Sequence, residues 1–230
     1  MEYFKKIELK QLKVFQTIDD RDRNSSVDIF RGIAILSVVF FHYSYLPYGY
    51  LGVDLFFVIS GLLVGRVLIK SFSNNEKISF FKFIITRGFK IWPSYYFFIF
   101  SGALISYILY RDLNPKQVLL LNNLPKYLFF YLNYKGGSYY AHHMWSICVE
   151  EHFYILLPIL FILIQRVTNN KKYLFISMGL MAIGGISSKI IGYCINFETY
   201  TATHNRIDQL ALGVILSLLI FYNKDKVEKF

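Results

Sequence analysis

The sequence predicts an all-α fold, a bundle of helices that cross a membrane. Hydrophobic residues make up 55% of the 230 residues and charged residues only 17%, whereas soluble domains average about 25% charged. The apolar residues are also gathered into six runs of roughly 16–22 residues, close to the length of about 20 that a helix needs to cross a bilayer. The predicted helices are 27–46, 51–69, 91–110, 144–164, 173–194 and 207–222.

The two ends of the chain are polar and predict cytoplasmic tails. Residues 1–24 carry mixed charges and lack the apolar core of a signal peptide. Residues 25–223 then form the membrane domain, and the charged residues 224–230 form a second tail. The net charge of +10 comes from Lys and Arg between the apolar runs, so membrane orientation and anionic lipid explain it better than nucleic acid.

Lys and Arg between the runs also predict the orientation, because cytoplasmic loops carry an excess of these residues. The loop from Lys70 to Lys90 is basic and is placed inside, whereas the turn 47–52 has no charge and is placed outside. We therefore expect a multi-pass protein of the plasma (inner) membrane with a cytoplasmic N-terminus. Residues 118–134 contain three Asn and one Pro. They favour a re-entrant or partial helix beside six full spans, and seven spans are the alternative.

The first run holds two polar residues that an ordinary lipid-facing helix would not need. Arg31 and His42 are eleven residues apart, which places them on one helix face and roughly 16 Å apart along the axis. Asp28 lies three residues before Arg31 and can pair with it. In the alternative interpretation, Arg31 is a snorkelling anchor at the inner end and His42 lies at headgroup level.

Other ionisable residues fall at the same two depths of the predicted bundle. Arg87 and Lys90 lie near the inner side, together with Arg31, and such cations suit phosphate groups. Near the outer side, at the depth of the imidazole, lie Glu150, Arg206 and Asp208. A His beside carboxylates suits proton transfer, so the pattern predicts a site with a cationic inner end and a proton-transferring outer end.

The second run contains the string GVDLFFVISG, which combines a carboxylate with small residues. Asp54 can cap the helix or lie near the positive end of its dipole. Ser60 and Gly61 allow a close approach of either a helix or a ligand. The two cysteines, Cys148 and Cys194, lie inside predicted helices and are expected to be reduced core residues. No Cys/His spacing in the sequence suggests a metal site.

Five ordered elements of the sequence together resemble the acyltransferase 3 family of polytopic membrane acyltransferases. The first is the Asp–Arg–His pattern of the first run, and the second is GVDLFFVISGLL. The third, RGFKIWP, resembles an Arg-x-x-Arg-x-x-Pro element in which Lys90 replaces the second Arg. The fourth is MWSICVEEHFYILLP and the fifth is HNRIDQLALG. The matching residues of these last two elements are Trp145, Ser146, Glu150, Phe153, Tyr154, Pro158, Arg206, Asp208, Leu210 and Gly213.

The resemblance implies an enzyme that transfers an acyl group, most often acetyl from acetyl-CoA, to a hydroxyl of a cell-envelope or exported glycan. It implies that His42 is catalytic and that the element with Arg87 and Lys90 helps to handle the donor. In the mechanism we expect from the residues and the resemblance together, Glu150 orients the imidazole or the sugar. The expected partners are therefore acyl-CoA, a hydroxyl acceptor and the lipid bilayer, with no tightly bound cofactor.

Two other functions fit the same polar residues. A transporter or flippase for a glycan precursor could use them as a pathway, although such proteins often show internal repeats and none is visible here. An inactive membrane scaffold is the third hypothesis. Members of the family usually have about ten spans, so we expect this chain to be either a short member or a C-terminally truncated one.

Overall fold

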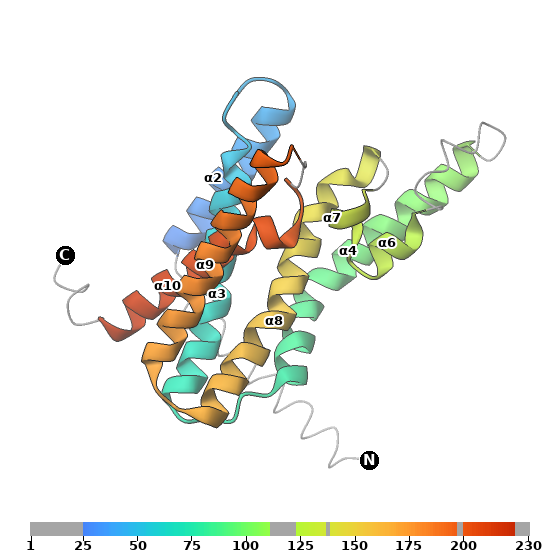
Figure 1. Ribbon diagram of the computed structural model, residues 1–230. Coiled ribbons are helices and arrows are strands. Elements are labelled where there is room, and N and C mark those ends of the chain that lie inside the picture. The colour runs from blue at the N-terminus through green and yellow to red at the C-terminus, as the bar shows by residue number, and fades with distance from the viewer. Residues whose placement is uncertain (1–24, 111–122, 137–138, 197–199, 224–230) are drawn as a thin grey trace, which may run out of the picture. The chain divides into compact units, whose positions relative to one another are not determined.

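The computed structural model describes residues 25–110, 123–136, 139–196 and 200–223, and every regular element among them is a helix (Figure 1). The predicted tails, 1–24 and 224–230, lie outside the described residues. The chain divides into two compact units, residues 1–52 and residues 53–230. The predicted all-α class is therefore confirmed for the described part of the chain.

The described part of the first unit is a single helix and the turn that follows it. Helix α2 spans Ser25–His42 and ends four residues before the predicted limit. It ends there because Ser44 adopts a left-handed conformation, with φ of 62°, which an α-helix cannot continue. The turn then folds back onto the helix, and a Cβ at Gly49 would meet the backbone oxygen of Ser37. The ring of Tyr50 packs edge-on against Phe41, with centroids 5.7 Å apart.

The second unit contains five longer helices and several short ones. The longer ones are α3 (Leu51–Ser73, which begins at the end of the first unit), α4 (Phe80–Tyr110), α8 (Trp145–Val167), α9 (Lys171–Cys194) and α10 (Ile207–Tyr222). Four stretches, Leu51–Ser73, Phe80–Ile108, Ala141–Val167 and Lys171–Cys194, are long and apolar enough to cross a membrane, and α10 is a shorter apolar helix. The count of six full spans stays a prediction.

Helix α4 begins eleven residues earlier than the predicted Ile91. Arg87 and Lys90 are therefore residues of the helix itself, and Pro93 also lies inside it. The prediction was wrong here because a charged residue ends an apolar run without interrupting the backbone hydrogen bonds of a helix. The long side chains of Lys and Arg can reach away from an apolar surface while their backbone remains helical.

Residues 118–134 were predicted to form a re-entrant or partial helix, and the described part of this segment forms only short helices. Helix α6 covers Leu124–Leu128 and α7 covers Leu132–Lys135. At 1.5 Å per residue, neither approaches the thickness of a bilayer. Two further 3₁₀ turns, η1 (Tyr139–Met144) and η2 (Thr203–Asn205), precede α8 and α10. Residues 118–122 of the predicted segment lie outside the described residues.

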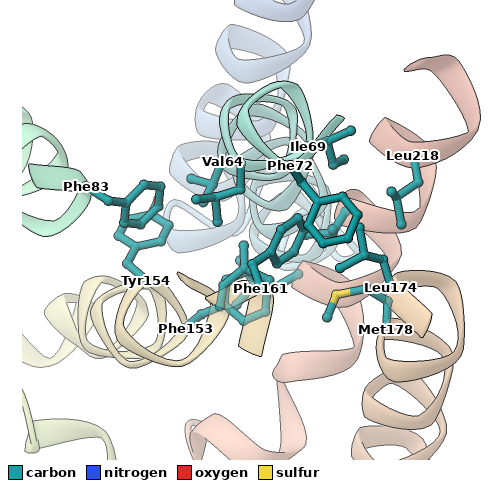
Figure 2. Packing of buried hydrophobic residues seen from close by; sticks show 14 of the residues in the cluster. Val64, Ile69, Phe72, Phe83, Phe153, Tyr154, Phe161, Leu174, Met178 and Leu218 are labelled. Carbon is teal, nitrogen blue, oxygen red and sulfur yellow. The ribbon is translucent and has the colours of Figure 1, made fainter. Parts of the chain in front are cut away.

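Helix α8 supplies the centre of the larger apolar core. Phe153 and Phe161 are fully buried, and Figure 2 shows them directed toward Phe72 of α3 and toward α9. Phe72 and Phe161 pack edge-on, with ring centroids 6.0 Å apart. Phe83 of α4 and Tyr154 of α8 belong to the same buried cluster (Figure 2). The aromatic side chains of one face of α8 therefore hold α3, α4 and α9 in one unit.

Helices α3 and α10 approach each other closely through glycine. A Cβ on Gly61 of α3 would collide with the backbone oxygen of Leu210, and a Cβ on Gly213 of α10 would collide with that of Val58. Gly65 lies one turn further along α3, where a Cβ would come within 3.1 Å of Val214. Small residues at such a crossing let two backbones meet. This crossing brings the beginning of α10 beside α3 and so positions the polar site described next.

Candidate functional site

A cavity of about 330 Å³ lies in the second unit, where α9 ends and α10 begins. It is bordered by side chains from the beginning of α3, the end of α9 and the turn before α10. Its lining residues are Asp54, Lys189, Tyr193, Tyr200, Asn205, Arg206 and Gln209. Asp54 and Arg206 were candidate site residues from the sequence, and the fold brings them together across 152 positions of the chain.

Arg206 is the centre of the first of two ion pairs at this cavity. Its Nη1 donates to Oδ1 of Asp54 at 2.6 Å, and its Nε donates to the carbonyl oxygen of Tyr200 at 2.7 Å. The ring of Tyr200 covers the guanidinium at 3.7 Å, and the ring of Trp145 lies 5.6 Å away. Arg206 is only 5% exposed, so these partners supply the hydrogen bonds and cation–π contacts that a buried guanidinium needs.

Lys189 and Asp208 form the second ion pair, with Nζ 2.7 Å from Oδ2. Gln209 joins the two pairs. In the amide orientation that satisfies both of its polar atoms, it donates to the carbonyl oxygen of Arg206 and to Oδ1 of Asp208, both at 2.7 Å, and accepts from Nζ of Lys189 at 2.8 Å. Gly185 of α9 makes room for this arrangement, because a Cβ there would come within 2.9 Å of the Cβ of Asp208.

Another polar group of the second unit lies between α3, α4 and α8. The hydroxyls of Ser60 and Tyr154 are hydrogen-bonded at 2.6 Å, and Glu150 is buried one turn before Tyr154 on α8. Nη2 of Arg87 also reaches the carbonyl oxygen of Leu63 at 3.4 Å. Four predicted site residues therefore belong to this group. They are Arg87 of the predicted inner group, Glu150 of the predicted outer group, and Ser60 and Tyr154.

A third group of polar residues connects α7, α8 and η2. Nδ2 of Asn133 donates to Oγ1 of Thr203 at 2.8 Å, and the same Oγ1 lies 2.7 Å from Nδ1 of His152. The hydroxyl of Thr201 donates to the carbonyl oxygen of Asn133 at 2.8 Å. Asn133 and Thr203 are both buried. Because η2 leads directly into Arg206, this network fixes the turn that carries the guanidinium.

The other predicted site residues are described by the element that carries each of them. Asp28, Arg31 and His42 belong to the first unit, where the ring of His42 lies edge-on to Phe41 at 5.6 Å. Lys90 is exposed on α4. The hydroxyl of Ser146 donates to the backbone oxygen of His143 at 3.3 Å, in the turn that leads into α8.

Five residues of the cavity were not predicted from the sequence: Lys189, Tyr193, Tyr200, Asn205 and Gln209. One signal was available, because Lys189 interrupts an otherwise apolar run and an ionisable residue inside such a run generally faces protein or water. The two tyrosines could not be singled out in a chain that is 19% aromatic.

The expectation of two core cysteines was wrong for Cys194, which is exposed at the end of α9, whereas Cys148 is buried. Within the described ranges, no group of three or more His, Cys, Asp or Glu side chains is placed to hold a metal ion.

Comparison with known proteins supplies relatives over most of the chain. An O-acetyltransferase candidate of Staphylococcus aureus (strain COL) is 29% identical over 210 residues, covering 84% of this chain and 34% of the relative. Peptidoglycan O-acetyltransferase OatA of Listeria monocytogenes is 24% identical over 217 residues, which cover 86% of this chain and 34% of the relative. A candidate peptidoglycan O-acetyltransferase of Bacillus subtilis is 25% identical over 216 residues, which cover 84% of this chain and 33% of the relative.

The chain spans about a third of the length of these relatives. No solved structure matches it significantly. The model of the acyltransferase 3 family, described as an acyltransferase domain, matches residues 24–229. That match covers the first unit's α2, both ion pairs of the cavity and all of the longer helices. The chain belongs to the acyltransferase 3 family.

Proposed function

We propose that the protein transfers an acyl group, most directly acetyl, from acyl-CoA to a hydroxyl of a cell-envelope glycan. The observation that carries this proposal is the family match across residues 24–229. Relatives named O-acetyltransferases, one of them a peptidoglycan O-acetyltransferase, support the acetyl group and the glycan acceptor. Helices that are long and apolar enough to cross a membrane support an envelope location.

In this proposal His42 is the catalytic base. The imidazole takes the proton of the acceptor hydroxyl, whose oxygen attacks the thioester carbonyl of the donor. The bond between the carbonyl carbon and sulfur breaks, the acyl group becomes an ester of the acceptor, and the thiolate leaves as CoA. The proton held by His42 is then available to that thiolate, so the step balances with acyl-CoA and the hydroxyl as the only reactants.

Arg31, Arg87 and Lys90 are proposed to neutralise the phosphates of the donor on the cytoplasmic side. Arg87 and Lys90 lie three positions apart on α4, a spacing at which side chains of one helix are neighbours. The cavity with Asp54, Arg206 and Asp208 is then the acceptor side. The N-terminus is cytoplasmic in this arrangement, as the distribution of Lys and Arg along the sequence predicts.

The proposal is tested by replacing the imidazole. We expect His42→Ala to abolish the transfer of radiolabelled acetyl from acetyl-CoA to envelope glycan in isolated membranes, while the protein accumulates to the normal amount. The control is His142→Ala, since His142 is an exposed residue of η1 that has no proposed role. Glycan acetylation that persists in His42→Ala membranes would contradict the assignment of the base.

A further inference from the structure

We propose that the cavity between α3, α9 and α10 selects an uncharged, hydroxyl-rich ring, such as a neutral sugar, and rejects anionic glycans. This inference rests on the proposed function, because it assigns the cavity to the acceptor and narrows the class of acceptor. It depends on three features of the lining residues: the balance of their charges, their remaining hydrogen-bonding capacity and their exposed aromatic rings.

The charges at the cavity cancel in pairs. Arg206 is paired with Asp54 at 2.6 Å and Lys189 with Asp208 at 2.7 Å, so two cations face two carboxylates. Asp54, Lys189 and Arg206 line the cavity, and among its described lining residues no other side chain is charged. Asp208 is buried behind Lys189. An anionic ligand would therefore find no cation without a counter-ion and would approach the carboxylate of Asp54, which disfavours it relative to an uncharged ligand.

The same ion pairs keep hydrogen-bonding capacity for a neutral ligand. The side chain of Asp54 is 28% exposed and that of Lys189 is 35% exposed. Arg206 donates to Oδ1 of Asp54, and no hydrogen bond from the described residues reaches Oδ2. An ammonium has three donors. Two of those of Lys189 are used by Asp208 and Gln209, which leaves one for a ligand. A sugar hydroxyl both donates and accepts, so it can meet the carboxylate and the ammonium alike.

Two tyrosines add aromatic surface to the polar wall. Tyr193 at the end of α9 is 87% exposed, and Tyr200 is exposed beside the guanidinium that it covers. An aromatic ring with a polar hydroxyl suits a ligand that has both apolar faces and hydroxyl edges. A cavity of about 330 Å³ is at the small end of ligand sites, which fits a ring rather than a long chain.

The inference is tested by binding measurements without an acyl donor. The full chain is purified in detergent, and two probes are compared at low salt: a neutral β-linked hexose tetramer and the corresponding tetramer of hexuronic acids. We expect the wild-type protein to bind the neutral probe at least about tenfold more tightly. Asp208→Asn leaves Lys189 without its carboxylate and gives the cavity a net positive charge, so we expect this preference to shrink or reverse.

The opposite change replaces Lys189, the more exposed partner of the same pair. Lys189→Gln gives the cavity a net negative charge, so binding of the anionic probe should weaken further while binding of the neutral probe is largely retained. Lys172→Gln at the other end of α9 is the matched control, since it removes the same charge from the chain at an exposed residue far from the cavity. We expect this control to leave the ratio of the two affinities unchanged.

Three results would overturn the inference. They are equal affinity of the wild-type protein for both probes, an unchanged ratio in Asp208→Asn protein that melts at the normal temperature, and unchanged neutral binding in Tyr193→Leu protein. The last result would make Tyr193 an ordinary interfacial anchor. Loss of acetyl transfer alongside selective binding would contradict the proposed function alone, whereas equal acetylation of neutral and anionic acceptors would contradict this inference alone.

Discussion

The hydroxyl of Thr203 makes hydrogen bonds to side chains from two different helices. Asn133 Nδ2 can only donate, so the Thr203 oxygen accepts from it and its own proton is free for Nδ1 of His152. One buried atom therefore satisfies polar groups from α7 and α8 at once. Because the turn of Thr203 leads into Arg206, the network also fixes where the guanidinium emerges.

The stability of Thr203 variants tests this role. Thr203→Val keeps the shape of the side chain and removes the hydroxyl, which leaves a buried amide donor and an imidazole nitrogen without their partner. A loss of about 1–3 kcal/mol in the free energy of unfolding is expected from such unsatisfied groups. Thermal melting of the detergent-solubilised protein measures the loss, and Thr203→Ser, which keeps the hydroxyl, should remain close to wild type. Equal melting temperatures for the Val and Ser variants would argue against the network.

At the scale of the helices, the cavity depends on the close crossing of α3 and α10. Gly61 and Gly213 allow the two backbones to touch, and Arg206 lies directly before α10. Any separation of the two helices would therefore also separate Arg206 from Asp54. Ser60, beside Gly61 on α3, meets Tyr154 of α8, so the same stretch of α3 contacts two neighbouring helices.

A methyl group at Gly61 tests this crossing. Gly61→Ala should lower the free energy of unfolding by about 1–3 kcal/mol, as overpacking typically does, because the Cβ collides with the backbone of Leu210. The matched control is Gly179→Ala in α9, where a Cβ would meet nothing within 4 Å and where Ala favours the helix by about 0.5–1 kcal/mol. Urea or thermal unfolding measures both variants, and a Gly61→Ala protein as stable as the control would refute the close crossing.

At the scale of the whole molecule, the protein is a membrane protein whose longer helices position polar groups at their ends. The cavity lies where α9 ends, and α9 has 24 residues. A helix of that length extends roughly 36 Å, slightly more than the hydrocarbon core of a bilayer. The two ends of α9 are therefore predicted to face opposite sides of the membrane, with the cavity on the outer side.

Cysteine labelling tests this orientation. Cys194 is exposed at the end of α9, so a membrane-impermeant maleimide should label it in intact cells. A second protein, Cys194→Ser combined with Lys172→Cys, places the thiol at the beginning of α9 and should be labelled only after the membrane is opened. Labelling in detergent shows that both thiols can react. The reverse pattern in intact cells would invert the predicted topology.

Sequence patterns predicted the helices better than the contacts between them. Both bounds of α10 agree with the predicted Ile207–Tyr222, because apolar residues there begin and end with the helix. The start of α4 was wrong because charge interrupts hydropathy but not helical hydrogen bonding. Asp54 and Arg206 could be singled out as ionisable groups near apolar runs, yet their pairing depends on how α3 and α10 cross, which no local pattern encodes.

The pair between Asp54 and Arg206 also sets an order for biosynthesis. The two residues are 152 positions apart, so a ribosome that adds about 5–20 residues per second makes Asp54 roughly 8–30 s before its partner. Throughout that interval α3 is delivered to the membrane with an uncompensated carboxylate near its beginning. Assembly of the cavity is therefore a late, post-insertion event, completed only when α10 arrives and its glycine-lined face docks onto α3.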